Sequence, residues 1–502
     1  MAEKKMINEW TKERTLKSAM LFLMHSVLFM ALAALLLLFD KFSNLKEYMK
    51  EQGANYLYAV FCVALLFFVS YFYFFFEDRR LLESGREISL IFAVLDVHLI
   101  LSCLIGYHIA IYARPVALVA LLALVLTGRR SAIFMNILSA LLVFVIDSFA
   151  VPEVSAKVCY SSLIISFSAG MIALFMAGKT KTRWGLIGVG VAICVPIDAV
   201  ILLLEVPDLI GVEALINGQS NRTYILTQMG YGFFSGVMSV VIFLAVLPGF
   251  EVIFNCLTAY RLRELTSSDA RILKKLKEEA PGTYNHSMMV SQLAETCAAA
   301  LGENVDYARA AALYHDAGKL HYPEHFTENQ GDYNLHDELT PELSADIIRS
   351  HAKDGYTLIK AHHLPDFLAD VALQHHGTMP IRYFYAKALK MTDGELNIED
   401  FSYTGPKPQT KIAAIVMICD GAEAAVRAAN ARTPEQTEKA IRAVIEERMD
   451  LEQFSECDIT MADLTKIQYA LVNALTGVYH HRIQYPNIKY RRTDKGTKGE
   501  NQ

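Results

Sequence analysis

The sequence has little of what marks several common protein classes. Its eight cysteines are scattered, with no Cys-x-x-Cys pair and no dense disulfide framework, so we expect them to be small apolar residues in a reducing or lipid setting. Positive charge is not in excess either, with 47 Lys and Arg against 53 Asp and Glu. Because nucleic acid polymers are bound through a basic surface, they are excluded as expected partners.

Charge is also scarce over long stretches before residue 250. Hydrophobic residues make up 53% of the 502 residues, above the roughly 45–50% of globular chains, and the excess lies almost wholly in this first half. The remainder has mixed charge and the 3.6-residue periodicity of helices. We therefore expect a transmembrane domain over 1–250, juxtamembrane linker helices over 251–280, a soluble domain over 281–490 and a disordered tail over 491–502.

The apolar stretches predict about eight membrane-spanning helices. A helix needs roughly 17 to 25 residues to cross a hydrocarbon core of about 30 Å, and seven runs are long enough: 18–39, 56–76, 87–112, 131–150, 158–177, 184–204 and 227–248. An eighth run, 115–127, has only 13 residues. Counting it as a span puts every basic loop on one side, so the positive-inside rule favours eight spans with both termini cytoplasmic.

The other features of the first half do not predict a specific function. No small-residue cleavage site follows the first run, which we expect to be an uncleaved anchor. Ionisable residues occur within the runs and are a functional hypothesis by default. Because no repeated or broken-helix pattern typical of transporters accompanies them, we expect them to face the bundle interior or an interface. They are His25, Asp96, His98, His108, Asp147 and Asp198.

The soluble half is expected to be helical, which makes the fold class all-α. Alternating strand patterns are missing, apart from a short hairpin considered over 391–410. Within this half, the pair His315–Asp316 is the most informative feature, because further histidines and an aspartate with metal-binding side chains accompany it. The set is His286, His315, Asp316, His351, His375, His376 and Asp420.

These seven side chains predict a two-metal site. Imidazole and carboxylate suit Fe, Mn and Zn, and seven ligands are too many for one tetrahedral ion but suit two ions that share a carboxylate. His315 and Asp316, if adjacent on a helix, point about 100° apart, so both reach a site lying between their directions. The doublet His375–His376 has the same geometry. A two-metal hydrolase is therefore the first hypothesis.

Five short stretches of the second half form a further pattern: Glu-Ala-Pro-Gly-Thr-Tyr-Asn-His-Ser (279–287), His-Asp-Ala-Gly-Lys (315–319), Phe-Thr-Glu-Asn-Gln (326–330), Gln-His-His-Gly-Thr (374–378) and Gly-Pro-Lys-Pro-Gln-Thr-Lys (405–411). Together they resemble the HD-domain phosphohydrolases, in the membrane-anchored branch of seven-transmembrane receptors with an HD hydrolase, which includes cyclic di-AMP phosphodiesterases. The resemblance implies two divalent ions, Mn or Fe, one held by His286, His315, Asp316 and Asp420, the other by Asp316, His351, His375 and His376. Asp316 would bridge them.

The resemblance also implies an activity and a location. The chain would be a multi-pass protein of the bacterial cytoplasmic membrane whose HD domain hydrolyses cyclic di-AMP to linear pApA with a metal-activated hydroxide. Fuller members of the branch carry a large extracellular domain after the first span, whereas only residues 40–55 fill that gap here. A sensory ligand acting through such a domain is therefore not expected, and an oligomeric state is not specified.

Contacts to the substrate are predicted from residue type. Lys319 lies about one helical turn beyond Asp316 and is a candidate catalytic and phosphate-binding residue, with a surface lysine as the alternative. Lys407 is a second phosphate candidate. Adenine would stack on flat side chains, although such residues more often belong to a core. The aromatic candidates are Tyr383, Phe384, Tyr385 and Tyr403.

Alternative functions remain open at this point. The nearest keeps the chemistry and changes the substrate to cyclic di-GMP or another phosphoester. A second is a membrane receptor whose HD domain binds nucleotide without turnover, which has no need for a pair of metal ions. A third is a transporter with a regulatory HD domain.

Overall fold

The described residues are folded almost entirely as helices. The computed structural model describes residues 12–152, 154–180, 183–210, 218–331, 333–391, 395–431 and 433–478, in two compact units that divide between Arg261 and Leu262. Within these ranges there is no strand, only one antiparallel bridge between Pro380 and Ser402, so the hairpin considered over 391–410 is wrong. The all-α class is confirmed. The predicted tail, 491–502, lies outside the described residues.

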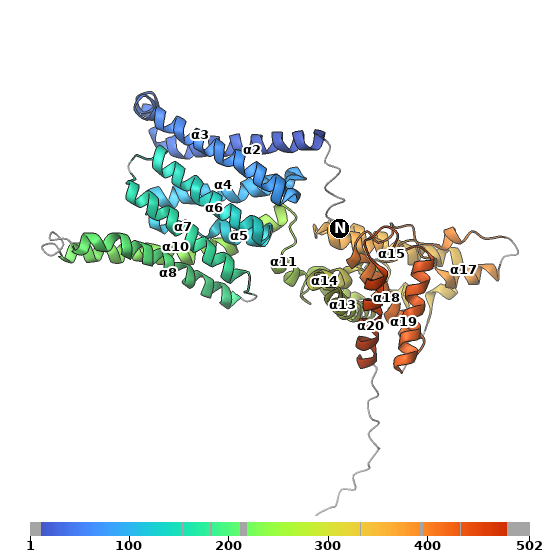
Figure 1. The fold of residues 1–502 in the computed structure, drawn as a ribbon. Helices are drawn as coiled ribbons and strands as arrows, with labels where there is room; N and C mark the ends of the chain where they lie inside the picture. The colour runs from blue at the N-terminus through green and yellow to red at the C-terminus, as the bar shows by residue number, and fades with distance from the viewer. Residues whose placement is uncertain are drawn as a thin grey trace, which may run out of the picture. The chain divides into compact units, whose positions relative to one another are not determined.

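The first unit is a bundle of long apolar helices (Figure 1). Helix α7 packs between α6 and α8, and α8 runs along α10. Each predicted span falls on one of these helices. Their bounds are α2 (Lys12–Leu38), α3 (Leu45–Glu77), α4 (Gly85–His108), α5 (Leu118–Leu126), α6 (Arg129–Ala150), α7 (Ala156–Ala177), α8 (Arg183–Ile210) and α10 (Gly218–Ile253).

Length and composition make this unit a membrane domain. Six described segments are long and apolar enough to cross a bilayer, and the first of them, Lys12–Glu77, contains both α2 and α3. Large apolar side chains such as Leu28, Phe61 and Phe68 are exposed on these two helices, an arrangement that suits lipid rather than water as the solvent.

The short helix α5 belongs to a segment that passes from one end of the bundle to the other. At one end, Ser131 at the start of α6 donates a 2.7 Å hydrogen bond to Asp78 after α3. At the other end, Asp40, His108 and Val151, which follow or end α2, α4 and α6, line one cavity. Residues 109–128 connect these two ends, which supports the predicted count of eight spans; the count itself stays a prediction.

A buried ion pair ties this segment to α6. The Arg114 guanidinium, 2% exposed, lies 2.5 Å and 3.0 Å from the two carboxylate oxygens of Asp147, which is fully buried. Tyr107 donates a 2.7 Å hydrogen bond to the same carboxylate. Asp147 therefore faces the bundle interior, as expected, whereas Arg114, which the sequence places at the margin of an apolar run, is part of the core.

The second unit is a helical domain built around α18. Every side chain from Ile412 to Cys419 is buried, so this part of α18 is apolar on all sides, as expected of a central helix. The helices are α11 (Ala259–Leu265, at the junction of the units), α12 (Arg271–Glu279), α13 (Pro281–Leu301), α14 (Val305–Tyr314), α15 (Pro341–Ala361), α16 (Asp366–Gln374), α17 (Arg382–Leu389), α18 (Lys411–Ala428), α19 (Pro434–Asp450) and α20 (Met461–Val478).

Candidate metal centre

The two residue doublets lie where helices end. Helix α14 stops at Tyr314, His315 is its C-terminal cap, and Asp316 begins the short 3₁₀ turn Ala317–His321. His375 caps α16 in the same way, with His376 just beyond. The expectation that each doublet lies within a helix is therefore wrong. The backbone leaves the helix at His315 and at His375, and Asp316 and His376 lie in the turns that follow.

Close packing explains why a glycine follows Asp316. A Cβ built on Gly318 would lie 1.9 Å from the carbonyl oxygen of His351, far inside van der Waals contact. Only glycine lets the turn approach α15 so closely. This contact brings Asp316 beside His351, although the two are far apart in the sequence.

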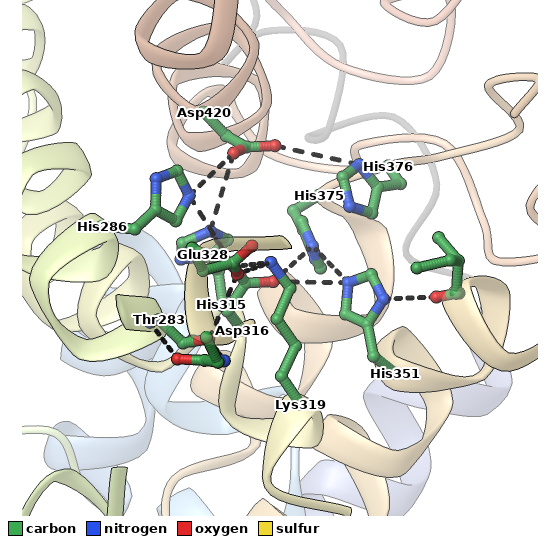
Figure 2. Close-up of polar contacts among 12 residues, drawn as sticks. Thr283, His286, His315, Asp316, Lys319, Glu328, His351, His375, His376 and Asp420 are labelled. Atoms are coloured by element: carbon green, nitrogen blue, oxygen red, sulfur yellow. Dashed lines mark hydrogen bonds and ion pairs between the residues drawn. The ribbon is translucent and has the colours of Figure 1, made fainter. Parts of the chain in front are cut away.

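The carboxylate of Asp316 lies between two groups of histidines (Figure 2). Its Oδ2 atom is 3.3 Å from His315 Nε2 and 3.7 Å from His286 Nε2. Its Oδ1 atom is 3.3 Å from His351 Nε2 and 3.6 Å from His375 Nε2. The potential metal ligands form two clusters that share Asp316: His286, His315 and Asp316 in one, and Asp316, His351, His375 and His376 in the other.

Three of the histidines are held in the same tautomer. The Nδ1 atoms of His315, His351 and His375 lie 2.6, 2.5 and 2.7 Å from the backbone carbonyl oxygens of Ala312, Ile348 and Ala372. A carbonyl oxygen only accepts hydrogen bonds, so each Nδ1 carries the proton and each Nε2 presents a lone pair. All three lone pairs face Asp316, and orienting an imidazole in this way is a common feature of metal ligands.

The facing lone pairs repel one another, whereas a cation between them would be attracted to both. His351 Nε2 and His375 Nε2 lie 3.2 Å apart, and His315 Nε2 is buried without a hydrogen-bond partner among the described residues. Two facing lone pairs repel unless a positive charge lies near both, and a buried polar atom without a partner is costly. The donor set, imidazole with carboxylate, suits divalent transition metals.

Asp420 and Glu423 hold His286 from two sides. His286 Nε2 lies 3.0 Å from Asp420 Oδ1, and its Nδ1 lies 2.9 Å from Glu423 Oε2. Asp420 also lies 4.0 Å from His315 Nε2 and 3.9 Å from His376 Nδ1, so all seven predicted side chains come together. Glu423 was not predicted, although its position three residues after Asp420 on α18 puts both carboxylates on one helical face.

Burial and charge shift the proton affinities of this cluster. Burial lowers the pKa of His315 to about 4 and that of His351 to about 3, which keeps both imidazoles neutral near pH 7. Burial also opposes the charged form of His286, but its hydrogen bonds to Asp420 and Glu423 outweigh it and raise the pKa to about 10. For Asp316, burial is overcome by His315 and Lys319, which hold its pKa well below the usual range.

Lys319 is bound to two carboxylates. Its Nζ atom lies 2.7 Å from Asp316 Oδ2 and 2.7 Å from Glu328 Oε1. Glu328 also accepts a 3.1 Å hydrogen bond from Thr283. A Cβ on Gly282 would lie 1.9 Å from the carbonyl oxygen of Glu328, so this glycine is needed for the approach. Glu328 is a further site residue that the sequence did not single out.

A cavity of about 250 Å³ opens in front of the cluster. Some of the predicted substrate-contact residues line this cavity and others do not. Tyr403 lines it together with Lys319, and the Tyr403 ring stacks on His376 with 4.3 Å between centroids. Tyr383, Tyr385 and Lys407 are not among its lining residues.

Each of those three side chains has another environment. Tyr383 is 66% exposed on α17. Tyr385 donates to the carbonyl oxygen of Leu396 and packs beside Phe384 in a small core. The Lys407 ammonium lies 3.1 Å from the Ser455 hydroxyl. The described contacts thus support Tyr403 as an aromatic candidate and give no support to the other three.

The second His-Asp pair of the sequence, His336–Asp337, does not enter the cluster. It forms a short 3₁₀ turn, Leu335–Asp337, in which His336 Nε2 donates a 2.8 Å hydrogen bond to the carbonyl oxygen of His325. The Asp337 side chain is exposed. This pair therefore has a structural role in the loop before α15.

The fold and site together define a membrane-embedded helical protein with a His/Asp-rich HD-type domain. Residues 54–258 match the family "7TM receptor with intracellular HD hydrolase", and residues 283–425 match the HD domain family. The chain belongs to the family of 7TM receptors with an intracellular HD hydrolase.

Curated relatives match along both units. The chain is 36% identical to the cyclic-di-AMP phosphodiesterase PgpH of Listeria monocytogenes over 92% of its own length and 59% of the relative. It is 34% identical to PgpH of Bacillus subtilis over 84% of its length and 59% of that relative. The chain thus spans about three fifths of the length of these relatives.

Solved structures of the L. monocytogenes PgpH HD domain are also similar. One covers 42% of this chain and 100% of the solved chain, with 46% identity and a TM-score of 0.41. Another, in complex with cyclic-di-AMP, covers 43% of this chain and 99% of that chain, with 48% identity and a TM-score of 0.41.

Proposed function

We propose that the chain is a membrane-bound, metal-dependent phosphodiesterase that hydrolyses cyclic di-AMP to linear pApA. The observation that carries the proposal is the Asp316 carboxylate, which presents one oxygen to each of two histidine groups. A cluster that shares one carboxylate suits two cations, and the relatives that match over most of the chain are named cyclic-di-AMP phosphodiesterases.

The ligand sets follow the two clusters. His286, His315, Asp316 and Asp420 would hold one divalent ion, Mn or Fe, and Asp316, His351, His375 and His376 would hold the other. When bound, two such ions supply Lewis-acid stabilisation of charge on a phosphodiester and activation of a water nucleophile.

The remaining residues would prepare the site. Lys319 neutralises part of the charge of Asp316 and Glu328, which keeps both carboxylates ionised beside the incoming anionic substrate. Tyr403 presents a flat ring at the cavity wall, where an adenine base could stack for about 1–3 kcal/mol. The HD domain and both termini would face the cytoplasm, since the basic loops of the membrane unit belong on that side.

The experiment uses the full chain in lipid nanodiscs. It would be incubated with Mn²⁺ and either cyclic di-AMP or cyclic di-GMP, and the products identified by mass spectrometry. We expect pApA from cyclic di-AMP, loss of turnover in Asp316→Asn, and wild-type turnover in Asp337→Asn, the matched control from the second His-Asp pair. Equal turnover of both substrates would contradict the base preference. No turnover of either by metal-loaded protein would favour a nucleotide-binding receptor.

A further inference from the structure

Arg427 is a cationic side chain on the cavity wall that the sequence did not single out. It lines the cavity with His286, Lys319 and Tyr403. Arg427 follows Asp420 by seven residues, or two helical turns, so it lies on the same face of α18. Its side chain is 53% exposed, and it therefore combines access to solvent with a place beside the cluster.

Its charge is less neutralised than that of Lys319, the other lysine or arginine among the described residues that line the cavity. The Lys319 ammonium has carboxylate oxygens of Asp316 and Glu328 each at 2.7 Å and is only 12% exposed. Among the residues that the structure describes, Arg427 forms one ion pair, with Glu423, in which Nη1 lies 3.4 Å from Oε1. A guanidinium has five N–H donors and binds phosphate in a bidentate way. Arg427 is thus better suited than Lys319 to bind an added anion.

Glu423 connects this arginine to the metal cluster. One of its carboxylate oxygens lies 3.4 Å from Arg427 Nη1 and the other lies 2.9 Å from His286 Nδ1, and the Glu423 side chain is only 6% exposed. A buried carboxylate with both oxygens engaged has little freedom to move. It therefore sets the position of the guanidinium relative to His286.

We propose that Arg427 forms a phosphate-binding subsite for a second phosphate of the substrate, the one that is not cleaved, and that Glu423 is its positioning residue. This inference rests on the proposed function, because a cyclic dinucleotide carries two phosphodiester groups. When one of them reaches the Asp316 cluster, the other needs a cationic partner on the cavity wall. The subsite therefore selects substrates with two phosphates over simple diesters.

The test compares two substrates on the full chain in Mn²⁺-loaded nanodiscs. Cyclic di-AMP has two phosphates, whereas bis(p-nitrophenyl) phosphate has one. For Arg427→Gln we expect KM for cyclic di-AMP to rise roughly 10- to 100-fold, the effect of losing hydrogen bonds to a charged group, with kcat changing much less. The loss in kcat/KM on cyclic di-AMP should exceed that on the simple diester at least tenfold, and Arg427→Lys should recover part of it.

The matched control is Arg442→Gln on α19. Arg442 is 58% exposed and pairs with Glu438 four residues earlier at 3.5 Å, as Arg427 does with Glu423, but it does not line the cavity. It should retain wild-type constants. An unchanged KM in Arg427→Gln, an equal loss on both substrates, or loss of bound Mn²⁺ in this variant would each overturn the subsite.

A binding measurement separates this inference from the proposed function. Asp316→Asn and the double variant Asp316→Asn/Arg427→Gln would be titrated with cyclic di-AMP without turnover. We expect the double variant to bind at least tenfold more weakly. If the wild type fails to hydrolyse cyclic di-AMP but this difference holds, only the catalytic proposal fails. Equal binding, or no binding by either variant, overturns the subsite.

Discussion

His351 Nε2 and His375 Nε2 lie 3.2 Å apart, each with its Nδ1 proton donated to a backbone carbonyl. Neither nitrogen can donate to the other, so the pair is a repulsive contact inside a buried site until a cation binds both. The neighbouring Asp316 carboxylate, 3.3 Å and 3.6 Å away, adds the negative charge that such a cation needs.

Metal removal should therefore destabilise the second unit. We expect the full chain to unfold at a lower temperature with EDTA than with Mn²⁺. Each bound ion should add about 2.7 kcal/mol to the free energy of unfolding when free metal is 100 times Kd. Differential scanning calorimetry of the full chain measures this shift, because both tryptophans, Trp10 and Trp184, lie outside the unit that holds the cluster. Asp337→Asn should show the wild-type shift and Asp316→Asn little of it; the same unfolding temperature with and without metal would contradict the assigned ligands.

Glu423 should act on metal affinity through His286. The 2.9 Å contact to Nδ1 fixes the ring and increases its basicity, and losing such a partner costs about 10- to 100-fold in metal affinity. We expect Glu423→Gln to show this weakening in a Mn²⁺ titration. Glu438→Gln on α19, which removes a carboxylate that also pairs with an arginine four residues later, should bind as the wild type does. Equal affinity of both variants would remove the orienting role.

The stability of the metal-free protein should fall on acidification. The pKa of His315 is lowered to about 4 and that of His351 to about 3, against about 6.5 in an unfolded chain. Between pH 6.5 and 4 the unfolded state takes up protons that the folded state does not, so unfolding becomes easier as pH falls. At pH 5, each of these two histidines lowers the free energy of unfolding by about 2 kcal/mol relative to its value at neutral pH.

His286 has the opposite effect on stability, which it lowers as the pH rises. Its pKa, raised to about 10, gives stability that is complete below pH 6.5 and is lost as pH rises through 10. Chelated full-length protein should thus be most stable near pH 6.5 in urea titrations at a series of pH values. A midpoint that stays constant from pH 6.5 to 5 would show that the two buried histidines protonate freely in the folded state.

Much of the fold and of the cluster could be predicted because the relevant signals are local. Apolar runs of sufficient length identify spans, and His and Asp side chains in family-like motifs identify the cluster. The helix ends at Tyr314 and Gln374 could not be read in this way, since packing rather than propensity sets them. Gly318, which abuts the carbonyl of His351, is an example of such packing.

Other site residues depend on contacts that no single sequence reveals. Glu328 reaches Lys319 only because a distant glycine, Gly282, lets the loop approach. Tyr385 and Tyr403 are the same residue type and were both candidate adenine contacts, yet one packs in a small core and the other lines the cavity. The spacing of Arg427 from Asp420, two helical turns, places both on one face of a helix. This spacing points to a site residue only once the cavity is known.

Arg114 shows the same limit in the membrane unit, and it leads to the last prediction. A charge beside an apolar run normally marks the end of a span, but Arg114 pairs with Asp147, 33 residues later, at 2.5 Å.

Asp147→Asn leaves a buried guanidinium without its counter-charge, which should cost about 3–5 kcal/mol of stability. The double variant Arg114→Met/Asp147→Leu should be less damaging than Asp147→Asn, because apolar side chains replace both charges. Thermal unfolding of the full chain in detergent compares these variants, with the exposed Glu47→Gln as the control; a double variant as unstable as Asp147→Asn would show that the loss comes from packing rather than from the unpaired charge.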